Sequence, residues 1–435
     1  MMRTRFSGWW IATALALATT NAECAAPDAA TPRRFEPTGA YRLEHADGRT
    51  WVVTPDGEAT FILGVNHTQN FLKRPGRTKP LSDEATRRRS NRIVTDLTRW
   101  GFTALGYGAP REAQAALPYF EQMNTSGCSR WRSKAQFKYE DVFDPVYERG
   151  VTRLVRAVCN RAKKSTNLIG YFWTANPEWG PALARRRRGT DWVSTLRTLP
   201  PGAPGHVAYV HFLEERYGED SAAFEAAYGL PIGDGLSSVD FSTLDPDRET
   251  VAADDLVFLG RIAARYYSII GRETRAADPD HLIFGERYAM RDLPDVVVEA
   301  ALPHIDVLSV QPMTIGFESS EFERLHELSG KPMLVSDHSV AYPTAEHSNT
   351  LWEDVEDAAA VGREYGTFLD TAFARPFFIG LLRCEYSDHV TGDLLRQGMV
   401  DLDGEPRTAI TDAMKAAHAR ALELTVATDD DETGR

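Results

Sequence analysis

The sequence predicts an α/β protein, a (β/α)8 TIM barrel with a small N-terminal β meander and a long insertion after the fourth strand. The first observation is a set of eight short apolar runs, each ending in polar or aromatic residues. The second is the helix-like segments between most of these runs, such as "DEATRRRSNRIVTDLTRWG" and "VYERGVTRLVRAVCNRA". The third is that no glycine-rich phosphate-binding turn follows any run, which disfavours a doubly wound sheet.

The beginning of the chain has the pattern of a secretory signal peptide. Arg3 and Arg5 precede an apolar run over residues 9–18, and small residues follow it. This run is too short to span a membrane as a helix. We therefore expect residues 1–22 to be a signal peptide and the mature protein to be secreted or periplasmic.

A linker, a meander and the barrel are expected after the signal peptide. Residues 23–40 are rich in Pro and Ala, which is typical of a linker. The stretch "GAYRLEHADGRTWVVTPDGEATFILGVNH" places two Asp-Gly dipeptides between β-rich runs, which predicts antiparallel strands. The barrel is expected over residues 41–424, and the acidic tail over 425–435 is expected to be disordered.

The eight apolar runs are the expected barrel strands. Residues 181–255 are too long for one connection, so we expect them to form an insertion on the face where barrel active sites lie. Within this insertion, "HFLEERYGEDSAAFEAAYGL" predicts an amphipathic helix. The runs are Phe61 to His67, Phe102 to Gly106, Tyr119 to Asn124, Leu168 to Trp173, His281 to Arg287, Ile305 to Gln311, Pro332 to His338 and Phe378 to Tyr386.

Composition and charge exclude some partners. The chain has 435 residues, of which 43% are hydrophobic, and a formal net charge of −13. Phosphate binding needs a basic face, so we expect neither a nucleic-acid partner nor a membrane partner. The one basic run, Arg185 to Arg188, favours a solvated loop, and contact with an anionic substrate is the alternative.

The cysteines are Cys24, Cys128, Cys159 and Cys384, and they lack the short paired spacing of a zinc site. Export permits disulfides, which makes Cys128 and Cys159 the first pair to test. Free buried thiols are the equally weighted alternative.

The carboxyl ends of the expected strands carry amides, carboxylates and aromatic rings. In a barrel, catalytic groups come from these ends. Amides and carboxylates bind sugar hydroxyls, and an indole or phenol ring stacks on the apolar face of a sugar. We therefore expect a carbohydrate site that uses no metal and no cofactor. The residues are Asn66, His67, Tyr107, Gln122, Asn124, Asn176, Glu178, Glu286, Arg287, Gln311, Asp337, His338, Glu385, Tyr386 and Asp388.

Four segments resemble β-agarase-like glycoside hydrolases. "WVVTPDGEATFILGVNH" is similar to the opening of their barrel, and "LIGYFWTANPEWG" resembles their fourth strand. "FIGLLRCEYSDH" and "RQGMVDLDGEP" are similar to the last strand and the segment after it. The resemblance runs from about residue 40 to 420. It implies a clan-A-type barrel with an acid/base Glu after strand four and a nucleophilic Glu after strand seven.

The chain departs from the family pattern at both of these positions. An ungapped alignment puts Asn176 where the family has the acid/base Glu, and Asp337 where it has the nucleophile. An Asp can attack an anomeric carbon, but an Asn cannot protonate a leaving oxygen. Glu178 lies two residues beyond Asn176, roughly 6.5 Å further along an extended strand and on the same side.

Asp337 and Glu178 are therefore the expected catalytic pair. Glu178 could instead line the cleft or form a salt bridge, Glu286 could pair with Arg287, and Glu385 could donate a proton or hold a sugar hydroxyl. Carboxyl groups ~5 Å apart imply retention of configuration, and a gap of roughly 6.5–9.5 Å implies inversion. The expected substrate-binding residues are Asn66, His67, Trp173, Asn176, Trp179, Glu286, Arg287, Gln311, His338, Glu385 and Tyr386.

The function expected from these observations is that of a secreted glycoside hydrolase acting on a polysaccharide or oligosaccharide, agarase- or galactosidase-like. The alternative is a non-catalytic carbohydrate-binding protein on a decayed hydrolase barrel, which Asn176 favours.

Overall fold

The computed structural model describes residues 32–73, 80–134, 139–173, 178–218, 220–312 and 314–426. Within them, Pro32 to Val426 form one compact unit. The expected signal peptide, Asn176 and most of the expected tail lie outside the described residues. The signal peptide and the tail therefore stay predictions.

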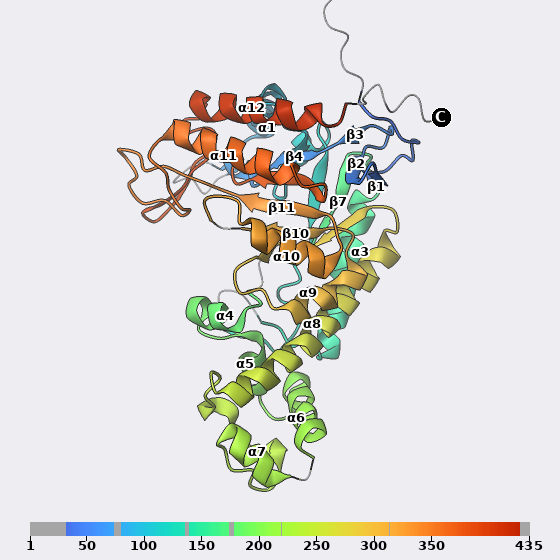
Figure 1. Ribbon diagram of the computed structural model, residues 1–435, viewed down its shortest axis with the longest axis vertical. Helices are drawn as coiled ribbons and strands as arrows, with labels where there is room; N and C mark the ends of the chain where they lie inside the picture. Colours follow the sequence, from blue (N-terminus) through green and yellow to red (C-terminus); the bar gives the residue numbers. More distant parts are fainter. Residues whose placement is uncertain are drawn as a thin grey trace, which may run out of the picture. The chain divides into compact units, whose positions relative to one another are not determined.

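The described chain forms an α/β fold around one large parallel sheet of nine strands (Figure 1). The strand order is β8-β7-β6-β5-β4-β12-β11-β10-β9. Each of the eight apolar runs contains one strand, and β9 is an additional short strand. The bounds are β4 Ile62–Val65, β5 Ala104–Leu105, β6 Tyr119–Gln122, β7 Leu168–Phe172, β8 Leu282–Gly285, β9 Tyr288–Ala289, β10 Leu308–Gln311, β11 Met333–His338 and β12 Phe378–Arg383.

The sheet is curled. Strands β8 and β9 are neighbours in sequence but lie at opposite ends of the strand order. The backbone N–H of Asp306, just before β10, donates to the carbonyl of Ile283 in β8 at 2.8 Å. The two ends of the sheet therefore approach each other, and its concave face encloses a separate hydrophobic cluster.

Two hydrophobic cores lie on the two faces of the sheet. Successive side chains of a strand point to opposite faces, so most strands contribute to both cores. The inner cluster includes Ile62, Phe120, Phe172, Phe284 and Leu334, which come from five different strands. The much larger outer cluster lies between the sheet and its helices.

Two of the helices that follow strands begin at side-chain caps. The Ser82 side chain accepts the N–H of Ala85 at the start of α1, and Asp144 caps α3 directly before Pro145. Figure 1 shows α11 and α12 side by side along the sheet. The bounds are η1 Thr68–Leu72, α1 Asp83–Arg99, α2 Arg111–Gln114, α3 Pro145–Ala162, α9 Asp295–Ala301, η4 Leu302–His304, α10 Ser319–Ser329, α11 Ala358–Phe373 and α12 Thr408–Glu423.

Two small antiparallel sheets complete the described strands. The meander is β1 Arg42–Ala46, β2 Arg49–Val53 and β3 Ala59–Thr60, and Asp47 and Gly48 form its first turn with positive φ angles. Val52 of the meander packs in the inner cluster of the large sheet. The hairpin of β13 His389–Thr391 and β14 Leu394–Arg396 follows the last parallel strand.

The segment between β7 and β8 is helical throughout much of its length. The expected amphipathic helix is broken at Gly218, whose φ is 57°, and a new helix begins after the cap Asp220. Figure 1 shows α6 and α7 beside the first turns of the long helix α8, away from the sheet. The bounds are α4 Pro181–Arg188, α5 Trp192–Arg197, α6 Pro204–Tyr217, α7 Ser221–Tyr228, η2 Leu236–Ser238, η3 Phe241–Thr243 and α8 Glu249–Ala277.

The prediction of a solvated loop for the basic run was wrong. Arg185 to Arg188 form the last turn of α4 and are ion-paired. Arg185 binds Asp191 at 2.7 Å, for example. Four adjacent positive charges are tolerated because carboxylates face them and because cations are favourable at a helix C-terminus.

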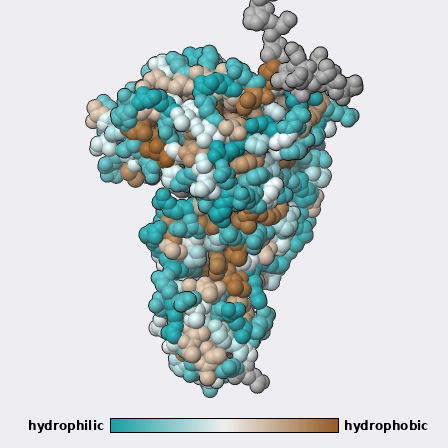
Figure 2. Space-filling model, viewed as in Figure 1, coloured by the Kyte–Doolittle hydropathy of each residue, from teal (hydrophilic) through white to brown (hydrophobic). Residues whose placement is uncertain are grey.

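Cys128, Cys159 and Cys384 are free thiols. Cys128 and Cys159 therefore do not form the disulfide that was the first pair to test. No helix among the described residues is both long and apolar enough to cross a membrane. The face of the molecule shown in Figure 2 is mostly hydrophilic, with small hydrophobic patches.

Candidate active site

Asp337, near the end of β11, lies at the centre of a cluster of hydrogen-bond donors. Its Oδ1 accepts from Asn66 Nδ2 at 2.9 Å. Its Oδ2 accepts from the Tyr107 hydroxyl at 2.5 Å, from Gln311 Nε2 at 2.9 Å and from Arg287 Nη1 at 3.3 Å. These side chains follow or end four other strands, so the curled sheet brings five separate chain segments to one carboxylate. The Asp337 side chain is still 12% exposed, which leaves it reachable from solvent.

The donors around Asp337 are themselves held in place. The guanidinium of Arg287 lies over the Tyr107 ring, 3.6 Å from its centroid. Asn66 also donates to the Ser336 carbonyl at 2.8 Å. A Cβ at Gly106 would lie 2.0 Å from Asn66 Oδ1, so only glycine leaves room for this amide. A carboxylate oriented this way can serve as a nucleophile or as a general base.

Glu385, two residues after β12, is the second carboxyl group of the cluster. Its Oε2 accepts from Asn70 Nδ2 at 2.8 Å, and its Oε1 lies 3.0 Å from Arg396 Nε without the alignment of a hydrogen bond. Burial raises the pKa of Glu385 to about 6, against the lowering effect of Arg396, and the charge of Asp337 raises it further. Glu385 can therefore carry a proton at weakly acidic pH.

Glu286 directly follows β8 and contacts α8. It is fully buried and accepts a hydrogen bond from the hydroxyl of Tyr266 on α8, while its other oxygen has no partner. Burial raises the pKa of Glu286 to about 8, so it is protonated at neutral pH. The expected ion pair with Arg287 is not formed, because Arg287 binds Asp337 instead.

Glu178 is bound by the basic turn of α4. Its Oε2 accepts from Arg188 Nε at 2.9 Å, and its Oε1 accepts from Arg187 Nη1 at 3.2 Å. The side chain is only 4% exposed. No hydrogen bond joins Glu178 to Asp337 among the described residues, and Asn176 lies outside them. Arginine guanidinium groups therefore bind both carboxylate oxygens of Glu178.

Four of the expected substrate-binding residues point away from the Asp337 cluster. The fully buried Trp173 donates its indole N–H to Thr274 of α8 at 3.3 Å. Trp179 is buried and stacks on Trp192, and the Tyr386 hydroxyl donates to Asp96 of α1 at 2.8 Å. His338 is buried against Tyr365 and Phe368 of α11.

His67 does belong to the cluster. Its ring contacts the edge of Tyr107, with centroids 4.7 Å apart. Burial lowers the pKa of His67 to about 4, and three nearby cations, Arg396, Arg287 and Lys73, lower it as well. His67 is therefore neutral at ordinary pH and can bind a sugar hydroxyl but cannot supply positive charge.

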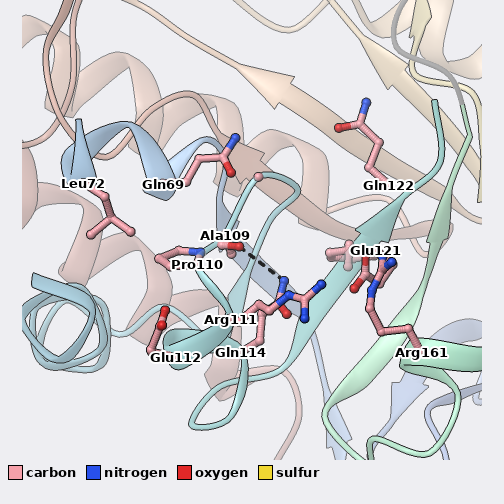
Figure 3. A pocket seen from close by; sticks show the side chains of 12 residues that line it. Gln69, Leu72, Ala109, Pro110, Arg111, Glu112, Gln114, Glu121, Gln122 and Arg161 are labelled. Carbon is pink, nitrogen blue, oxygen red and sulfur yellow. Dashed lines mark hydrogen bonds and ion pairs between the residues drawn. The ribbon is translucent and has the colours of Figure 1, made fainter. Parts of the chain in front are cut away.

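A polar pocket of about 500 Å³ lies beside the cluster. Figure 3 shows Gln69 on one side of it and Gln122, at the end of β6, on the other, with Arg111 and Gln114 projecting from α2. Gln69 is bonded through its backbone N–H to Gly108, the residue after Tyr107. The pocket is lined mainly by amides and charged groups.

The sequence reasoning missed Asn70, Lys73 and Arg396. None of them ends a parallel strand, which was the signal used. Asn70 is on η1, directly after the first strand, and Arg396 reaches Glu385 because the β13–β14 hairpin follows the last strand. Among the described residues, no group of three or more His, Cys, Asp or Glu side chains is placed to hold a metal ion.

Known proteins share both the sequence pattern and the fold. Beta-agarase B of Vibrio sp. (strain JT0107) is 21% identical to this chain over 399 residues, which cover 86% of the chain. The chain is thus similar in sequence to the β-agarases. A solved exo-β-agarase matches 91% of it with a TM-score of 0.76 and 18% identity, and a second agarase structure matches with a TM-score of 0.77. No protein-family model matches.

The chain spans only part of the length of these similar proteins. It spans 40% of the length of Beta-agarase B and 67% of the chain in each of the two solved structures. The resemblance of the four sequence segments to β-agarase-like proteins is thus confirmed, and the activity is a separate question.

Proposed function

We propose that this protein is a secreted glycoside hydrolase that cleaves a galactan-type polysaccharide or its oligosaccharides. The observation that carries the proposal is the Asp337 carboxylate, held by four donors beside the second carboxyl group of Glu385. Proteins to which the chain is similar are named agarases, and the amide and charged side chains at the strand ends can form hydrogen bonds with sugar hydroxyls.

We also propose that the curled sheet closes as a (β/α)8 barrel. The hydrogen bond from Asp306 to Ile283 supports closure, as does the inner cluster, which draws on seven of the nine strands. Residues 181–255 would then be an insertion after the fourth barrel strand, and the N-terminal signal pattern supports export.

In the proposed reaction Asp337 is the nucleophile or base and Glu385 is the proton donor. Glu385 protonates the glycosidic oxygen as the bond to the anomeric carbon breaks, and Asp337 either attacks that carbon or activates the attacking water. Asn66, His67, Arg287 and Gln311 are the proposed substrate-binding residues. Glu286 is too deeply buried to touch a sugar, and Trp173, Trp179, His338 and Tyr386 serve the outer core.

The pair of Asp337 and Glu178 is the alternative assignment. Glu178 follows the fourth strand, where the family pattern places its acid. We favour Glu385 because both oxygens of Glu178 are bound by arginines of α4.

Replacement of Glu178 tests this choice. We expect Glu178→Gln to lower the free energy of unfolding by about 1–2 kcal/mol, because a buried carboxylate loses two partly exposed guanidinium partners. The kcat/KM should change less than about tenfold. Denaturant unfolding and steady-state kinetics measure the two effects. A loss of kcat/KM as large as that of an Asp337 variant would return the proton-donor role to Glu178.

The proposed function is tested by incubating the purified protein with agarose, other galactans and plant polysaccharides, and measuring reducing ends. Release of reducing ends from at least one glycan supports hydrolysis. Binding of a glycan without any release would select the alternative of a carbohydrate-binding protein, for which the replacement of the family Glu by Asn176 is the supporting observation.

A further inference from the structure

Three cations lie around the proposed active site, although the whole chain carries a net charge of −13. They are Arg287, Arg396 and Lys73, and all three act electrostatically on the ring of His67. A chain of contacts joins two of them, because Lys73 donates to Asn70 at 2.8 Å and Asn70 donates to Glu385, which lies beside Arg396. Lys73 and Arg396 therefore lie on the same side of the site, next to Glu385, while Arg287 lies beside Asp337.

All three cations have unused hydrogen-bonding capacity, because the Nε of Arg396 also has no aligned acceptor. The Nε of Arg287 is buried without an acceptor, and the side chain is only 5% exposed. Lys73 is exposed, and its Nζ bonds to the Asn70 amide oxygen with no carboxylate in ion-pair range among the described residues. Arg396 is 26% exposed, and its guanidinium lies 5.8 Å from the centre of the Trp352 ring.

The charges of the site do not balance when it is ready to react. A proton donor must begin the reaction protonated, so Glu385 is then neutral and Asp337 is the remaining carboxylate of the cluster. Asp388 does not compensate, because Arg407 binds both of its oxygens at 2.8 and 2.9 Å. Two partly buried guanidinium groups, those of Arg287 and Arg396, then face one anion with the exposed Lys73 nearby, and this excess of positive charge favours a further negative group.

We propose that the substrate glycan carries an anionic substituent, a carboxylate or a sulfate ester, that binds between Lys73 and Arg396. This inference rests on the proposed function and names its substrate class. A guanidinium binds two oxygens of either group at once, and an ammonium adds a point charge. Arg287 holds Asp337 in the same site, while Lys73 has the anionic group as its partner.

A simpler explanation is that the cations only tune the two catalytic carboxyl groups. Arg287 and Arg396 each lie beside one of these groups and fit that explanation. Lys73 does not, because it contacts neither carboxylate directly. Lys73 is therefore the residue whose replacement separates the two explanations.

The test uses oligosaccharides of one galactan backbone in three forms: neutral, sulfated, and with a uronic acid at one unit. We expect the protein to hydrolyse one anionic form with a kcat/KM at least tenfold higher than the neutral form. Lys73→Gln should reduce this preference about five- to tenfold. Lys415→Gln on α12, which removes the same charge from an exposed position, should leave the preference unchanged. Comparison of the sulfated and uronic forms identifies the anion.

Equal or faster hydrolysis of the neutral form would overturn the inference and leave the proposed function standing. So would a preference for the anionic forms that Lys73→Gln does not change. If no form is hydrolysed, calorimetric binding decides: tighter binding of an anionic form that depends on Lys73 supports the inference while the proposed hydrolysis fails. Equal binding of all forms, or none, overturns the inference.

Discussion

Asp337→Asn is expected to lower kcat/KM on the glycan by at least about a thousandfold. The change keeps the size of the side chain but removes the negative charge that attacks the anomeric carbon or activates water. Asn has an N–H group where Asp337 now accepts from Tyr107, Gln311 and Arg287, so the donor cluster loses its acceptor. Steady-state kinetics on the best glycan of the substrate screen measure the loss.

Asp278→Asn is the matched control for this variant. Asp278 also sits in a buried network, where it accepts from the Tyr171 hydroxyl at 2.6 Å and lies 2.8 Å from His281 Nδ1, but it precedes β8 at the opposite ends of the strands. We expect Asp278→Asn to lower stability and to change kcat/KM less than about threefold. An equal loss of activity in both variants would show that Asp337 acts only through the fold.

The configuration of the products separates the two roles of Asp337. If Asp337 is a nucleophile, azide can replace it in the Asn variant and restore turnover of an activated glycoside with inverted stereochemistry. If Asp337 is a base, the products already have inverted configuration and the first covalent intermediate never forms. NMR of the first product released by the parent enzyme decides between them: retained configuration indicates a nucleophile, and inverted configuration indicates a base.

The strands and Asp337 were predictable because both depend on local pattern. A short apolar run with a polar end marks a buried strand wherever it occurs, and Asp337 directly follows "MLVS". Asn66, Gln311 and Arg287 could be placed at the same edge because parallel strands all end there. Their convergence on one carboxylate follows from the curl of the sheet, which no single run encodes.

The direction of the strand-end side chains was not predictable. The pairing of β7 with β8 shifts register between Tyr171 and Phe172, and that of β11 with β12 shifts between Val335 and His338. A shift of one residue moves the following side chains to the other face of a sheet. His338 comes after the shift in β11 and points into the outer core, although simple alternation from the apolar run gives no sign of it. The extra residue of the β7–β8 shift lies in β8, and Trp173 reaches the outer core by continuing the alternation of Tyr171 and Phe172.

Long-range partners were also beyond the sequence. Arg187 and Arg188 reach Glu178 because the chain turns directly into α4. The sequence of a basic run does not show whether its arginines bind a distant carboxylate or face solvent in a loop. Arg396 reaches Glu385 through the β13–β14 hairpin. Both contacts decide which carboxyl group is free to move a proton.

Glu385→Gln is expected to lower kcat/KM on a natural glycan by roughly 10²–10⁴-fold, the usual contribution of a general acid. Its pKa is raised to about 6 by burial, with Arg396 opposing and Asp337 and Asp388 adding to the rise. The catalytic form is the protonated one, so the activity of the parent should fall about tenfold per pH unit once the pH exceeds this pKa. The pH profile of kcat/KM should lose this alkaline limb in the Gln variant.

An activated substrate shows whether the missing proton is the cause. The leaving group of a dinitrophenyl glycoside needs no proton, so Glu385→Gln should hydrolyse it within about tenfold of the parent rate, while Asp337→Asn should not. Glu178→Gln serves as the comparison, because it removes a carboxylate of similar burial that is bound by arginines. If Glu178→Gln instead showed the selective loss on natural glycans, the proton would come from the end of β7 and the ion pairs with α4 would have to open during the reaction.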